Sequence, residues 1–68
     1  NPVLDFLYVE STMNKSTLQI FDLNGKLLIN QTIENQLSTI DVSNLINGIY
    51  ILRISNGKFI NTTRINVE

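Results

Sequence analysis

Every glycine in this chain directly follows an asparagine, and that pairing is the feature that most limits the fold. The three pairs are Asn24-Gly25, Asn47-Gly48 and Asn56-Gly57, each set between runs of aliphatic residues. Asparagine and glycine enter positive φ at the lowest cost, and the tight turns that match the twist of paired strands need positive φ. The pattern therefore predicts an all-β protein built from hairpins.

The composition agrees with strands and leaves packing as the main source of stability. The chain has 68 residues, enough for one domain, and contains ten Ile, nine Leu and four Val but no Ala. β-Branched residues favour strands. A chain of this length buries only about 60% of the surface that its unfolded form exposes. Because it has neither Cys nor His, we expect no disulfide, no metal and no cofactor.

Alternating apolar and polar residues predict six or seven short strands. The predicted strands cover residues 3–10, 17–22, 26–33, 37–42, 48–55 and 58–67. Strands 17–22 and 26–33 should be antiparallel neighbours around Asn24-Gly25. Gln31 interrupts the apolar face of its strand, which indicates either a β-bulge or an edge position. Inward-facing residues should include Leu18, Ile20, Leu27, Ile29, Ile33, Ile40, Val42, Ile65 and Val67, with Arg64 and Asn66 outward and Leu45 closing one end.

Residues 48–55 form the most apolar stretch and should be a central strand. Ile49 and Ile51 oppose Tyr50, Leu52 and Ile54, so both faces of this strand are expected to be buried. Two stacked sheets would bury both faces, which favours a sandwich over a single sheet.

The aromatic residues divide into two groups. Tyr50, Phe21 and Phe59 are expected to pack in the core, whereas Phe6 and Tyr8 alone are candidates for exposed rings. Their strand, residues 3–10, should be partly covered on both faces.

The charges argue against a nucleic-acid partner, and the length of the apolar runs argues against a membrane span. Five basic and six acidic residues give a formal net charge of −1, and Lys15, Lys26 and Lys58 are scattered singly. This pattern predicts no nucleic-acid partner. The longest apolar run, residues 49–52, is far shorter than the roughly 20 residues that span a bilayer as a helix, so we expect no membrane span.

No set of residues indicates catalysis, since the chain lacks His and its carboxylates are not paired in sequence. Asp22-x-Asn24 resembles the start of a calcium loop, but Lys26 occupies the next ligand position. Asp22 is therefore expected to accept backbone N–H bonds in its own turn. Asp41, followed by Ser43 and Asn44, has the same two interpretations, and turn capping is again favoured.

Three short motifs, taken in order, resemble a known bacterial family. They are the opening Asn1-Pro2, then Ile20-x-Asp22-x-x-Gly25-Lys26, then Leu45-x-x-Gly48-x-Tyr50-x-Leu52-x-Ile54. Their order and spacing resemble the type A C-terminal sorting domain of the type IX (Por) secretion system across nearly all 68 residues.

The resemblance implies an immunoglobulin-like antiparallel β-sandwich of about seven strands. It also implies that residues 1–68 are a single C-terminal sorting domain from a larger secreted protein. In such proteins the cargo reaches the periplasm, the outer-membrane translocon recognises the terminal domain, and a sortase-like cysteine protease typically removes it. The domain is then a substrate and not an enzyme, and we expect a monomer exported to the cell surface or the medium.

The resemblance also implies which residues matter for sorting. Asp22, Gly25 and Lys26 would form the motif turn, Gly48 and Tyr50 the start of the central strand, and Arg64 the basic position of the last strand. The remaining recognition candidates are Asn1, Pro2, Leu45, Ile65 and Val67. The family's tail usually ends in a basic residue after an apolar pair, whereas this chain ends Arg64-Ile65-Asn66-Val67-Glu68.

Two other functions stay open at this point. The polar Asn- and Thr-rich surface, with Phe6 and Tyr8, is compatible with an adhesive or carbohydrate-binding immunoglobulin-like module. A structural spacer between other domains is the third alternative.

Overall fold

The structure, a computed structural model, describes residues 2–3, 6–10, 15–34 and 37–68, and its regular elements are all β-strands. The seven strands are β1 (Pro2–Val3), β2 (Phe6–Glu10), β3 (Ser16–Phe21), β4 (Leu27–Ile33), β5 (Leu37–Asp41), β6 (Gly48–Ser55) and β7 (Ile60–Val67). The predicted all-β class is confirmed.

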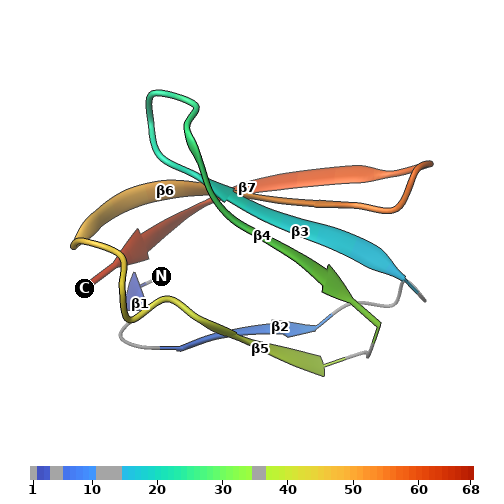
Figure 1. Cartoon of the computed structure of the whole chain (residues 1–68), viewed down its shortest axis with the longest axis horizontal. Helices are drawn as coiled ribbons and strands as arrows, with labels where there is room; N and C mark the ends of the chain where they lie inside the picture. The colour runs from blue at the N-terminus through green and yellow to red at the C-terminus, as the bar shows by residue number, and fades with distance from the viewer. Residues whose placement is uncertain (1, 4–5, 11–14, 35–36) are drawn as a thin grey trace.

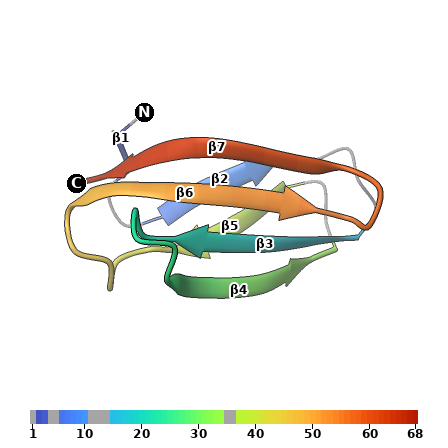
Figure 2. The ribbon, with the colours of Figure 1, turned by 90° about the horizontal axis from the view of Figure 1, so that it is seen from above.

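The strands form two sheets that lie face to face (Figure 1). The larger sheet has the order β1-β7-β6-β3-β4, and the smaller one consists of β2 and β5. Figure 2 shows the small sheet behind the large one. Strands β2 to β7 pair antiparallel as predicted. The short β1 is the exception, because it pairs parallel to the end of β7.

Most strand boundaries follow the turn chemistry, but the prediction of one strand over residues 3–10 is wrong, because β1 belongs to the large sheet and β2 to the small one. β6 has the predicted bounds and is the middle strand of five, as expected. β3 starts one residue earlier than predicted and ends before Asp22, because Asp22 belongs to the turn. β5 ends at Asp41 for the same reason. Asn35 and Gln36, where the sequence predicts a turn between strands 26–33 and 37–42, lie outside the described residues, as do residues 11–14 and residues 1, 4 and 5.

Two of the three Asn-Gly pairs form hairpin turns. Gly25 (φ 89°) connects β3 to β4 and Gly57 (φ 92°) connects β6 to β7. The third pair, Asn47-Gly48, joins β5 to β6, with Gly48 as the first residue of β6, as predicted. Those two strands belong to different sheets, so the chain crosses between the layers there instead of forming a hairpin.

The core lies between the sheets and is built from one side of each strand. Fully buried aliphatic residues from β3, β5, β7 and the loop after β5 meet there, together with Tyr50 and Leu52 of β6. The buried set is Val9, Leu18, Ile20, Ile33, Ile40, Val42, Tyr50, Leu52, Ile65 and Val67. Leu45 and Ile29 are half-buried against this cluster.

The expectation that both faces of β6 are buried is wrong. Tyr50 and Leu52 face the core, but Ile49 on the opposite side is 42% exposed and Ile51 is half-buried. The two-stranded sheet covers only one side of the large sheet (Figure 1). The other side, called the outer face below, has no second layer among the described residues.

Three further side chains differ from expectation: Phe21 is half-buried on the outer face, where it pairs with Ile51, and Phe59 and Leu27 are exposed. Phe59 is 63% exposed, since it lies in the β6–β7 turn beyond the sheets. Leu27 is exposed because the β3–β4 register shifts between Ile20 and Phe21, which places Leu27 opposite Phe21. This shift, and not Gln31, marks the irregularity in the hairpin. The alternative prediction of an edge position for β4 is confirmed.

The strand with Phe6 and Tyr8 is covered on one side only. Val9 is buried and Leu7 packs against the core, as predicted for one face. Phe6 and Tyr8 are both exposed, Tyr8 by 70%. Their predicted exposure is confirmed, and the expected partial cover on that face is wrong because no described layer lies beyond β2.

Asp41 caps the turn that follows β5, as predicted. Its Oδ1 accepts hydrogen bonds from the Ser43 hydroxyl (2.6 Å) and the Ser43 backbone N–H (2.9 Å). Both bonds favour the carboxylate, and they lower the pKa of Asp41, with the hydroxyl bond as the larger cause. The backbone N–H of Leu45 then donates to the Val42 carbonyl and closes the turn.

This lowered pKa predicts a pH-dependent contribution to stability. Because the pKa of Asp41 is lower in the folded state, its stabilising effect is present above the unfolded value of about 3.9 and is lost as pH falls through the folded value. The thermal midpoints of the parent and Asp41→Ala should therefore differ at pH 5–7 and converge in more acidic buffer. Ser43→Ala removes only the hydroxyl bond and should show a smaller difference. A gap between parent and Asp41→Ala that is independent of pH would contradict this account.

Candidate recognition surfaces

The register of the large sheet gathers most of the predicted sorting residues at one end of the molecule. Gly48 pairs with Val67, Tyr50 with Ile65, and Ile51 with Arg64. Ile51 also pairs with Phe21, which immediately precedes the Asp22 turn. Pro2 of β1 pairs with Asn66 at the same end, on the left in Figure 2. Asn1 lies outside the described residues. The motif turn, the start of β6, the end of β7 and β1 are far apart in sequence but lie together at this end.

The motif turn at this end is held by the Asp22 carboxylate. Oδ1 of Asp22 accepts hydrogen bonds from the backbone N–H groups of Asn24 and Lys26, each at 2.9 Å. The N–H of Gly25 donates to the Asp22 carbonyl at 3.1 Å, with Gly25 in the left-handed region that glycine adopts without strain. The predicted turn role of Asp22 is confirmed. Lys26 keeps its side chain exposed beside this rigid turn.

The other candidates at this end are mostly buried and hold the backbone of this surface in place. Tyr50, Ile65 and Val67 are buried in the core, and Leu45 is half-buried. The Tyr50 hydroxyl donates a hydrogen bond to the Ile46 carbonyl, which ties the loop before β6 to the sheet. Arg64 is exposed on β7. Of the candidates whose side chains the structure describes, Lys26 and Arg64 are therefore the ones that a partner can reach most readily.

One long edge of the large sheet is open along most of β7. β1 pairs only with Asn66 and Val67, and within the described ranges no strand pairs with residues 60–65 on the side away from β6. An open edge presents unpaired backbone N–H and C=O groups that can accept a further strand. Ile60 adds an exposed apolar side chain to this edge. The edge is therefore suited to backbone recognition.

The outer face carries a fixed arginine that the sequence interpretation did not identify as a site residue. Nε and Nη2 of Arg53 donate to Oε1 of Gln19 at 3.2 and 2.6 Å, and the guanidinium lies 5.0 Å from the centre of the Phe21 ring. Phe21, Leu23, Ile51, Arg53 and Thr62 line a depression of about 340 Å³ together with Asp22 and Gly25. A charged residue at an outward position in the middle of an apolar strand was the available signal.

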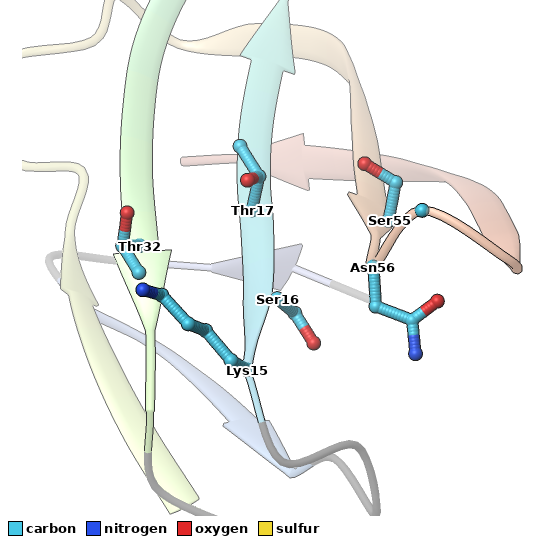
Figure 3. Close-up of a pocket in the computed structure, with 7 residues that line it drawn as sticks. Lys15, Ser16, Thr17, Thr32, Ser55 and Asn56 are labelled. Atoms are coloured by element: carbon cyan, nitrogen blue, oxygen red, sulfur yellow. The ribbon is translucent and has the colours of Figure 1, made fainter.

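A second, more polar depression lies at the opposite end of the outer face (Figure 3). It has a volume of about 350 Å³, and its lining comes from β3, β4, β6 and the adjoining turns. The lining residues are Lys15, Ser16, Thr17, Thr32, Ser55, Asn56 and Gly57. Asn56 holds the turn beside it, because its Oδ1 accepts the backbone N–H groups of Lys58 and Phe59. Hydroxyl and ammonium groups thus dominate this end.

Taken together, these features define a small β-sheet domain that presents a rigid turn, an open strand edge and a partly apolar sheet face. Within the described ranges no group of three or more Asp and Glu residues is placed to hold a metal ion, and no helix is long and apolar enough to cross a membrane. Such a surface is suited to recognition by another macromolecule.

The chain belongs to the family described as the secretion system C-terminal sorting domain, which matches it over residues 1–68. Neither the curated proteins nor the solved structures contain a match to it. The family is that of the type IX secretion system, as the resemblance implied. The domain is therefore a non-catalytic sorting signal that interacts with the secretion machinery and directs secretion to the cell surface or beyond.

Proposed function

We propose that residues 1–68 form the C-terminal domain of a larger exported protein and act as its folded address. In this proposal the upstream cargo crosses to the periplasm, and the outer-membrane translocon then recognises the domain. A sortase-like protease at the cell surface acts on the same protein afterwards. The family match over the whole chain is the observation that carries the proposal.

The recognition surface in this proposal is the end of the large sheet that holds the motif turn and the terminal strand. Lys26 and Arg64 are exposed there, while Tyr50, Ile65 and Val67 hold the backbone in place. The open edge of residues 60–65 gives the translocon a backbone to pair with. We also propose that the two facing sheets are a reduced immunoglobulin-like sandwich acting as a monomer.

A reporter fusion tests the address directly. Residues 1–68 are attached to the C-terminus of a periplasmic reporter in a host that has the type IX system. We expect the reporter at the cell surface or in the medium, and we expect it to stay in the periplasm of a strain that lacks the translocon. Retention in both strains, or release in both, would contradict the proposal.

Carbohydrate binding is a second candidate function, favoured by the neighbouring exposed rings of Phe6 and Tyr8 on β2. Exposed aromatic rings can stack on sugars. A glycan array probed with the isolated domain and with its Phe6→Ala/Tyr8→Ala variant discriminates: binding that the variant loses would support this second function.

A further inference from the structure

The register of the large sheet assigns Arg53 and Arg64 to the outer face. Residues paired across neighbouring strands point to the same side, so each register row can be assigned to one face. Arg64, Ile51, Phe21 and Leu27 form one outer row, and Thr62, Arg53, Gln19 and Asn30 form the next. The third row ends at Ser55, Thr17 and Thr32, where Lys15 lines the polar depression.

None of these outer rows contains Asp or Glu, although the whole chain has six acidic and five basic residues. Asp22 lies at the rim, where one of its carboxylate oxygens already accepts two backbone N–H groups of its own turn. A chain with a formal net charge of −1 thus places two of its five basic residues, Arg53 and Arg64, in outer rows that hold no acidic residue, and a third, Lys15, lines the polar depression at the far end.

The side chain of Arg53 is preorganised for binding. The guanidinium has five N–H donors in a planar fork, and its described hydrogen bonds use only Nε and Nη2. Contact with the Phe21 ring and with Gln19 limits its rotamers, so less side-chain entropy is lost on binding. Its remaining donors can bind a carboxylate.

The apolar residues around Arg53 indicate the class of partner. Ile51 and Leu23, which line the same depression, are half-buried and exposed, and Ile49 is exposed one outer row beyond Ile51. Aromatic residues and arginine within an apolar patch are typical of protein interfaces. Binding to anionic lipid usually needs a cluster of four to eight basic residues, and a polyanion gains affinity with each phosphate contact. Three separated positive charges are too few for either an anionic lipid surface or a polyanion.

We propose that the outer face is a docking surface for an acidic protein surface of the secretion machinery, with Arg53 and Arg64 as the charged contacts around Phe21 and Ile51. This inference rests on the proposed sorting function and names the chemistry of its partner. Complementary charge would also orient the domain during encounter.

Charge reversal in the reporter fusion tests the inference. Arg53→Glu and Arg64→Glu should each lower export at least tenfold, whereas Lys58→Glu should stay within twofold of the parent. Lys58 is the matched control because it is exposed in the β6–β7 turn and undergoes the same change of charge. Arg64→Glu decides the result if Arg53→Glu lowers the thermal midpoint, since Arg64 is exposed and has no described side-chain partner.

A photo-crosslinking amino acid at Thr62 identifies the partner during export. We expect an adduct with an acidic protein of the secretion machinery that is lost in Arg64→Glu and absent when the probe is at Tyr8. Adducts from Tyr8 alone, or a lipid or polysaccharide adduct from Thr62, would overturn the inference. Normal export of both arginine variants would also overturn it while the sorting function stands; failure of the parent fusion to be exported would instead contradict the sorting function.

Discussion

Replacing Leu18 with alanine is expected to lower the free energy of unfolding by about 2–5 kcal/mol, which is the usual cost of removing a fully buried leucine side chain. Leu18 has no exposed surface and lies at the centre of the core on β3. At about 0.05–0.15 kcal/mol per residue, a chain of this size has a total stability of roughly 3–10 kcal/mol. The variant should therefore be marginally folded, as measured by urea denaturation followed by circular dichroism.

Leu23→Ala is the matched control for this measurement. It removes the same atoms from a side chain that is 65% exposed in the β3–β4 turn. Its effect should stay within about 0.5 kcal/mol, as is usual for surface positions. Equal losses at Leu18 and Leu23 would contradict the core described above.

The strands and the inner face were predictable because both follow from local rules. A period of two places Leu18 and Ile20 on one side of β3, and Ile65 and Val67 on one side of β7, whatever the rest of the chain does. All four side chains are buried. The turn at Asp22 was equally local, because its carboxylate reaches backbone groups only two and four residues away.

Whether a second sheet covers the outer face of β6 was not predictable from the same pattern. An apolar run such as residues 49–52 shows that both sides can be buried, but the number of strands in the opposite sheet decides whether they are. The second sheet here has two strands and lies on one side. Arg53, at an outward position in that strand, was the local sign of exposure.

The candidate site was predictable as a set of residues but not as a surface. The motifs named Asp22, Gly48 and Arg64 separately, and only the β3–β6 and β6–β7 registers bring them to one end of the sheet. The link between Gln19 and Arg53 spans 34 positions and depends on the same pairing. Side chains that meet across a sheet leave no signal within one strand.

Deleting residues 64–68 is expected to abolish export of the reporter fusion. The deletion removes two buried side chains, Ile65 and Val67, and with them the partners of Gly48, Tyr50 and β1. The end of the sheet that holds the motif turn then loses its support. We expect at least a tenfold loss of exported reporter. In the purified fusion, the cooperative thermal transition of the sorting domain should also be lost.

Two full-length variants separate the need for a folded sheet from the need for a particular tail. Ile65→Ser/Val67→Ser keeps the chain length but places two hydroxyls in the core, where polar groups without partners are costly, so it should lose export as the deletion does. Asn61→Ser/Thr63→Ser makes two serine substitutions at exposed positions of the same strand and should be exported like the parent. If the core variant were unfolded and still exported, the machinery would be reading an extended tail, and the sheet geometry would play no part in sorting.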